Sequence, residues 1–215
     1  FESPKVRVVG QGIEVSRFMA LPPPPDRDHL RLLALGRLSP AKGLLPIVEA
    51  CIAARGGGLP VKLRIVGPAT TPLEADHAET LRRAAESTGG GIAIDSPVPH
   101  DKVPDLLAES DVLVNGMRSG SGDKVVLEAM AAGRPVLYSN PCFDSLTEGL
   151  SVCLRYREGD PVDLVRRLHD LWGAGTEMRR KLGAELATRV AAFHSLDGWA
   201  DRVVGVVTAL TRRAA

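Results

Sequence analysis

Two glycines and two cations follow a short apolar run near the start of the chain. The run LRLLALG ends at Gly36, Arg37 comes next, and Lys42 and Gly43 stand where a helix is predicted to begin. Backbone N–H groups at a helix N-terminus attract an anion, and a guanidinium with an ammonium adds the positive charge that a diphosphate requires. The stretch indicates a phosphate site, while a surface loop with two solvated cations explains it equally well.

A glycine-rich stretch further along the chain offers a second set of anion-binding groups. Gly120, Ser121 and Gly122 expose backbone amides, as the absence of large side chains allows. Asp123 is placed to cap the next helix, and Lys124 falls in its first turn, where the helix dipole disfavours a cation. A bound phosphate would offset the unfavourable interaction of Lys124 with the helix dipole, and we predict that this stretch contacts a phosphate.

Glu128 lies one turn after Lys124, among apolar neighbours on the same predicted helix. A carboxylate in such a place suits a pair of vicinal hydroxyls, such as those of a ribose. The alternative is an i,i+4 ion pair with Lys124, which would contribute only about 0.3 kcal/mol.

Two further loops follow predicted strands. The turn after Gly67 has small residues that let a ligand approach the backbone, but the chain lacks the GxGxxG of an ordinary nicotinamide-dinucleotide site. In SPVPH, Pro97 and Pro99 stiffen the loop and leave the amide and carbonyl of Val98 available to the edge of a base. We expect His100 to begin or cap a helix rather than to act in catalysis, because the sequence shows no acidic partner.

The elements that position these residues alternate along the chain. Short β-branched runs and longer segments of helical period predict an α/β protein with a Rossmann-like, doubly wound parallel sheet, most of whose strands are covered on both faces. We predict strands at 5–10, 30–36, 61–67, 91–95, 111–115, 135–139 and 152–156, and helices at 44–55, 73–88, 101–109, 160–172, 176–193 and 197–212. Ligands of such sheets bind at the carboxyl ends of the strands, where the residues above are expected.

Composition narrows the classes of function. The 215 residues are 44% hydrophobic and 25% charged, with a net charge of +1, and neither a basic block for nucleic acid nor a bilayer-spanning run is evident. The three cysteines lack the spacing of a zinc site or a disulfide framework, so we expect them to be buried and reduced. With no charged-then-apolar leader, a cytoplasmic location is expected.

Several motifs, in this order, resemble the C-terminal half of glycosyltransferase family 4, a family of retaining enzymes with two facing Rossmann-like domains, the GT-B fold. The motifs are QGIEVSRF (11–18), GRLSPAKG (36–43), LRIVG (63–67), PHDKVPDLLAESDVLV (99–114), VVLEAMAAGRPVL (125–137) and EGDPVDLVRRL (158–168).

The resemblance implies roles for individual residues. Arg37 and Lys42 match the family's contacts to the donor diphosphate, Ser96 to Val98 match the loop that meets the base, and Glu128 matches the residue that binds the ribose hydroxyls. The family has another glutamate eight positions before Glu128, where this chain has Gly120. That difference leaves the donor sugar and the catalytic competence open.

The implied function is binding of a UDP- or GDP-linked sugar and stabilisation of the leaving diphosphate during retaining transfer to an acceptor hydroxyl. No cofactor beyond the donor and no metal is expected, because no Asp-x-Asp stands among the site loops. Residues 1–215 would form one donor-binding domain, with 1–29 as interdomain connection and first strand and 197–215 as terminal helix.

The N-terminal acceptor domain would lie outside this sequence, so the isolated domain should bind the donor but turn over poorly or not at all. A peripheral position of the full-length protein at the inner face of a membrane is left open, as in family members with lipid acceptors. Two alternatives also remain: a catalytically lapsed donor-binding or interaction module, suggested by Gly120, and another GT-B enzyme such as a nucleotide-sugar 2-epimerase, which would need further acid/base residues.

Overall fold

A parallel five-stranded sheet forms the centre of the computed structural model, which describes residues 6–118, 120 and 122–214. The strands are β1 (Leu30–Leu35), β2 (Val61–Val66), β3 (Ile92–Asp95), β4 (Val112–Asn115) and β5 (Val136–Tyr138). Their order is β3-β2-β1-β4-β5, so the chain winds outward from β1 to β3 and then returns to the other side of β1. The prediction of a doubly wound parallel sheet is confirmed, and all five carboxyl ends lie along one edge.

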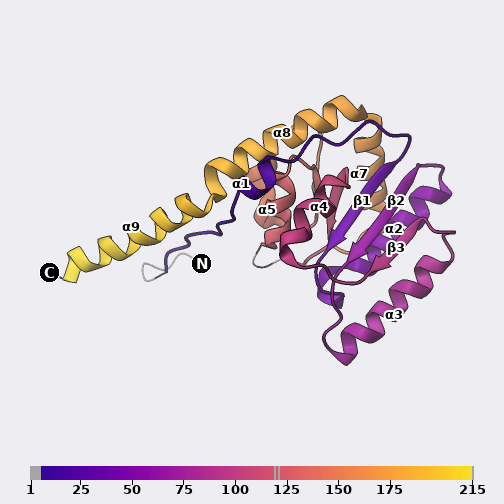
Figure 1. The fold of residues 1–215 in the computed structure, drawn as a ribbon, viewed down its shortest axis with the longest axis horizontal. Helices are drawn as coiled ribbons and strands as arrows, with labels where there is room; N and C mark the ends of the chain where they lie inside the picture. The colour runs from indigo at the N-terminus through magenta and orange to yellow at the C-terminus, as the bar shows by residue number, and fades with distance from the viewer. Residues whose placement is uncertain (1–5, 119, 121, 215) are drawn as a thin grey trace.

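Helices cover both faces of this sheet (Figure 1). Those of eight residues or more are α2 (Leu44–Gly56), α3 (Pro72–Glu86), α5 (Lys124–Ala131), α7 (Pro161–Gly173), α8 (Gly175–His194) and α9 (Leu196–Ala214). The shorter elements are α1 (Ser16–Met19), α4 (Val103–Ala108), α6 (Asp144–Thr147) and the 3-10 turns η1 (Pro40–Lys42), η2 (His100–Lys102) and η3 (Pro141–Phe143). On one face α3 and α7 pack against α2, and on the other α1 and α8 pack against α5.

Two predicted strands are not formed. Residues 6–10 carry no strand, and Val8 is 88% exposed, because no neighbouring strand is there to pair with them. The segment 152–156 makes only an isolated bridge between Arg155 and Tyr138, too short for a sixth strand. Residues 1–5 lie outside the described part of the chain.

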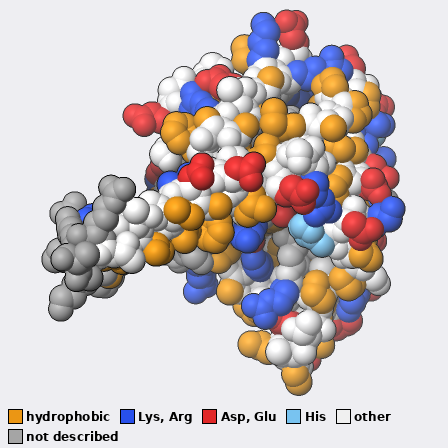
Figure 2. Space-filling model, turned by 60° about the vertical axis from the view of Figure 1, so that its left-hand side comes forward, with side chains coloured by type: hydrophobic (Ala, Val, Ile, Leu, Met, Phe, Trp, Pro, Cys, Tyr) orange, Lys and Arg blue, Asp and Glu red, His pale blue; other side chains and the backbone are white. Residues whose placement is uncertain are grey.

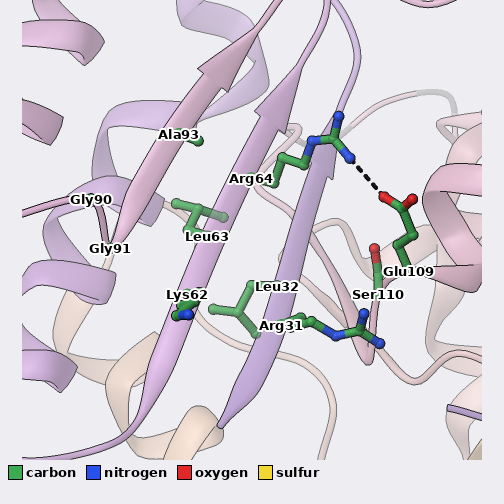
Figure 3. Close-up of a pocket in the computed structure, with 10 residues that line it drawn as sticks. All are labelled: Arg31, Leu32, Lys62, Leu63, Arg64, Gly90, Gly91, Ala93, Glu109 and Ser110. Carbon is green, nitrogen blue, oxygen red and sulfur yellow. Dashed lines mark hydrogen bonds and ion pairs between the residues drawn. The ribbon is translucent and has the colours of Figure 1, made fainter. Parts of the chain in front are cut away.

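One face of the sheet is less covered than its apolar composition predicted. Lys62 and Arg64 of β2 alternate with buried residues and reach solvent beside Ala93 of β3, because α4 is only six residues long. A hollow of about 470 Å³ lies here, and across it Arg64 pairs with Glu109 at 2.9 Å (Figure 3). Here β2 departs from the prediction that most strands are covered on both faces. The cysteines also differ from expectation, since only Cys51 is buried and the other two are exposed.

The last helix, α9, projects from the body of the protein (Figure 1). Trp199 is half-buried against the N-terminal segment, where Gly12 leaves room for it. Val204, Val207 and Leu210 are each more than half exposed, and Figure 2 shows hydrophobic side chains along the projecting part. Among the helices of the described residues, none is both long and apolar enough to cross a membrane.

A close contact of two backbones joins α8 to the turn after α5. A Cβ added to Gly183 of α8 would lie 2.0 Å from the carbonyl oxygen of Gly133, too near for any side chain. We expect Gly183→Ala to lower the free energy of unfolding by about 2 kcal/mol, because the two helices must separate to accept the methyl group.

Urea unfolding followed by circular dichroism measures this change. Gly205→Ala in α9 is the matched control, because a Cβ there meets nothing within 4 Å. That substitution should raise stability by about 0.5 kcal/mol through helix propensity alone. Equal unfolding midpoints for the two variants would contradict the importance of the α5–α8 contact.

Candidate functional site

Glycines bring the loops at the carboxyl edge of the sheet into direct contact. A Cβ on Gly67, after β2, would lie 1.8 Å from the carbonyl oxygen of Gly36, after β1. A Cβ on Gly43 would lie 2.3 Å from the carbonyl oxygen of Gly116, after β4, and Gly43 has a φ of +61° that favours glycine. The edge therefore assembles the loops of three strands within backbone contact, and Arg37 and Lys42 stand in it as predicted from sequence.

Lys42 forms an ion pair with Asp123 across this edge. The Lys42 Nζ donates to Asp123 Oδ2, and Asn115 Nδ2 donates to the same oxygen at 3.1 Å. Asp123 stands at the N-cap position of α5, but its side chain caps no amide, so the predicted capping role is wrong. The carboxylate binds Lys42 instead of a helix amide, because an ammonium forms a stronger hydrogen bond with a carboxylate than a neutral amide does.

Arg37 faces a different carboxylate. Its Nη1 lies 3.5 Å from Oε1 of the buried Glu74, while 62% of the Arg37 side chain remains exposed. The Thr70 hydroxyl and amide each donate to Glu74 Oε2 at 2.7 Å, and these bonds lower the pKa of the carboxyl below its usual value. Sequence analysis missed Glu74, although Thr71-x-x-Glu74 has the pattern of a capping box and Thr71 does cap α3.

Glu128 is buried on α5 and bonds to a histidine. His100 Nε2 lies 3.1 Å from Glu128 Oε1, and Arg17 approaches the other ring nitrogen of His100 at 3.2 Å. The expectation that His100 lacks an acidic partner is therefore wrong, because this partner is distant in sequence. His100 does begin the turn η2 as expected. No ion pair between Glu128 and Lys124 occurs among the described residues, so the i,i+4 alternative is also wrong.

Side chains from two other segments of the chain donate hydrogen bonds to the glycine-rich loop. Gln11 Nε2 donates to the carbonyl of Gly122 at 2.9 Å, and Asn140 Nδ2 lies within 3.4 Å of the carbonyl of Gly120. Gly120 has a φ of +140°, so a residue with a side chain would be strained there even though a Cβ would meet nothing. Lys124 is exposed as the first residue of α5, and Ser121 lies outside the described residues.

The remaining predicted site residues lie beside this edge. Ser96 is exposed and Val98 is partly buried against the core, both in the loop between β3 and η2. That loop leads directly into His100, so it is adjacent to Glu128. A groove of about 450 Å³, lined among others by Gln11, Gly120 and Phe143, adjoins the glycine-rich loop.

The chemistry that this edge offers is recognition of anions and hydroxyls. Its groups are three cations, three carboxylates and loop amides, and no nucleophile with an adjacent base is evident among the residues described above. Within 6–118, 120 and 122–214, no group of three or more His, Cys, Asp or Glu side chains could hold a metal ion.

Comparisons with known proteins point to one family, the group 1 glycosyl transferases. A family model described as glycosyl transferases group 1 matches residues 29–173. The putative colanic acid biosynthesis glycosyltransferase WcaL of Escherichia coli (strain K12) is 28% identical over 141 residues, covering 62% of this chain and 33% of that protein.

Two solved structures are also similar. Sucrose-phosphate synthase from Thermosynechococcus elongatus superposes with a TM-score of 0.79 at 19% identity, covering 96% of this chain and 53% of that one. Anabaena HepE in complex with UDP and glucose gives 0.75 at 16% identity, covering 92% and 55%. At such identities the likeness shows the fold, that of the GT-B glycosyltransferases. The chain spans about a third of WcaL and about half of each of the two structures.

The pair of Lys42 and Asp123 should contribute to stability as well as to the site. The side chains are only 20% and 17% exposed, so water screens them little. We expect Asp123→Asn to lower the free energy of unfolding by about 1 to 2 kcal/mol, because a charge-assisted hydrogen bond is replaced by a neutral one.

A double-mutant cycle with Lys42→Met isolates the interaction in urea unfolding. Asp201→Asn on exposed α9 is the control, since Asp201 has no ion pair among the described residues, and it should change stability by less than about 0.5 kcal/mol. A coupling energy of zero between positions 42 and 123 would show that the pair contributes nothing.

Proposed function

This chain belongs to the group 1 glycosyl transferases, and on that premise we propose that the carboxyl edge of its sheet binds a nucleoside-diphosphate sugar donor. The observation that carries the proposal is that glycine contacts join the loops of Arg37 and Lys42 to the loops after β2 and β4 at one edge of the sheet, and that Lys42 pairs there with Asp123, which precedes the helix on which Glu128 is buried. Cations suit a diphosphate and a buried carboxylate suits the ribose. The UDP and glucose bound by HepE support UDP as the nucleotide, with GDP as the second candidate.

Arg37 and Lys42 would then act on the leaving group. Negative charge grows on the diphosphate as the bond to the sugar breaks, and cations already in place lower the barrier without having to reorganise. We propose that these two side chains supply that charge without a metal ion, in a transfer that retains the anomeric configuration. Lys42 meets the diphosphate by sharing its donors between phosphate oxygens and Asp123, since an ammonium carries three.

The loop at Gly120 shapes the sugar side of the site. Its backbone conformation disfavours a residue with a side chain at position 120, and the carboxylate nearest this loop in sequence is Asp123. Oδ1 of Asp123 has no hydrogen-bond partner among the described residues. We propose that this oxygen, together with the loop amides and Lys124, contacts the donor beyond its ribose.

Transfer itself requires an acceptor site, which we place in the remainder of a longer protein because this chain spans only about a third of WcaL. In that longer protein, proton NMR of the anomeric centre of the product would check retention. The chain as it stands should bind the donor and catalyse little.

Calorimetric titration with UDP and with GDP tests donor binding directly. We expect one of them to bind, and Arg37→Ala combined with Lys42→Ala to weaken that binding by about a hundredfold, since each cation contributes about tenfold through charge-assisted hydrogen bonds.

The control combines Arg83→Ala and Lys181→Ala, which remove an arginine and a lysine that are 70% and 69% exposed. Within the described part of the chain, each pairs only with a neighbour on its own helix. It should bind as the unaltered chain does. Binding of neither nucleotide, or equal binding by the Arg37/Lys42 variant, would refute the proposed site.

A further inference from the structure

We propose that His100 is a positioning residue that fixes the carboxylate of Glu128 for the ribose hydroxyls, with Arg17 setting the tautomer of its imidazole. The inference rests on the proposed donor-binding function, and it adds two residues from separate elements to that site. The three side chains form a continuous hydrogen-bonded series from α1 through η2 to α5.

The first step concerns the oxygens of Glu128. The residue is 7% exposed and is surrounded on α5 by apolar side chains such as Leu127 and Val125. His100 Nε2 lies 3.1 Å from Glu128 Oε1 and forms a hydrogen bond with it. Glu128 Oε2 has no hydrogen-bond partner among the described residues. One oxygen is therefore held by the protein, and the other is available to accept from a hydroxyl.

The second step concerns the proton on the imidazole. Arg17 Nη1 lies 3.2 Å from His100 Nδ1, and a guanidinium has only donors to offer. Nδ1 must therefore accept with its lone pair, which places the ring proton on Nε2 in the neutral imidazole. That N–H donates to Glu128, so Arg17 determines that His100 is a donor to the carboxylate rather than an acceptor facing it.

The third step concerns how firmly this series is anchored. Arg17 Nη2 also donates to the backbone carbonyl of His100 at 3.3 Å, and Arg17 Nε lies 3.9 Å from Glu14. The short helix α1 that carries Arg17 packs against α5, which carries Glu128. Arg17 thus contacts both the ring and the backbone of residue 100, and its own helix is fixed relative to the carboxylate.

The consequence is a defined direction for Oε2. A glutamate without a partner on Oε1 samples several χ3 angles, and some of the binding energy is then lost to ordering it. With one oxygen held, the other presents its lone pairs in a fixed direction to a vicinal diol. His100 itself is 63% exposed at its side chain, so its replacement should alter ribose recognition far more than it alters folding.

The experiment compares a nucleotide with its 2′,3′-dideoxy analogue by calorimetry, using whichever of UDP and GDP binds more tightly. The ratio of the two affinities reports recognition of the ribose hydroxyls alone. We expect His100→Leu to reduce this ratio by about fivefold to tenfold, the effect of one misdirected charge-assisted hydrogen bond. Affinity for the dideoxy analogue should be unchanged.

His100→Gln is the matched variant, because its amide can donate to Glu128 while its carbonyl accepts from Arg17. It should keep most of the discrimination, and Arg17→Leu should lose part of it. Urea unfolding of each variant shows that the fold is retained. A structural role alone would lower the affinities for both nucleotides equally and would leave the ratio intact.

The result with Glu128→Gln separates two ways of failing. If that variant loses discrimination and His100→Leu keeps it, the positioning role is overturned and the donor site stands. If Glu128→Gln discriminates as well as the unaltered chain, or if neither nucleotide binds, the ribose contact is overturned and the positioning role with it.

Discussion

The close approach of glycine backbones at the carboxyl edge of the sheet is the constraint on which the site depends. Gly36 meets Gly67 and Gly43 meets Gly116 at distances that leave no room for a Cβ. These contacts draw the loops of β1, β2 and β4 together, and they place Lys42 next to Asp123, which is 81 positions away in sequence. Without them the charged side chains would stand on separate loops with water between them.

Both cations that we assign to the diphosphate already have an anionic partner. Lys42 forms an ion pair with Asp123, and Arg37 forms one with Glu74. Oε2 of Glu74 in turn accepts hydrogen bonds from Thr70. Such pairing holds each charge in place at the cost of some of its attraction for a ligand, which is the balance expected of preorganised sites.

A buried arginine fixes the frame in which Glu128 and His100 meet. Arg134 is 1% exposed, and burial lowers its pKa to about 10. Its Nε donates to the carbonyl of Leu107 near the end of α4, and its Nη2 donates to the carbonyl of Pro22, the first of four consecutive prolines. The residue follows α5 in the chain, so it joins the element after His100 to the element that bears Glu128. Arg134 thereby also ties the segment that contains these prolines to the core.

The sequence by itself determined the class of fold, five of the strands and the residues at their carboxyl ends. Those features follow from local periodicity and from the rule that parallel strands expose their carboxyl ends at one edge. The tertiary structure alone decided which charges pair. The Lys42–Asp123 and Glu128–His100 contacts span 81 and 28 positions, and no local pattern encodes them.

Two predicted strands failed for different reasons. The segment 6–10 has no neighbouring strand to pair with, whereas 152–156 pairs with Tyr138 of β5 through a single bridge, which is too short for a strand. Asp123 likewise has the residue type and position of a helix cap, yet its carboxylate turns to an ammonium that only the folded loops bring near. Residue type specified what each group could do, and the tertiary contacts of the folded chain determined which partner it met.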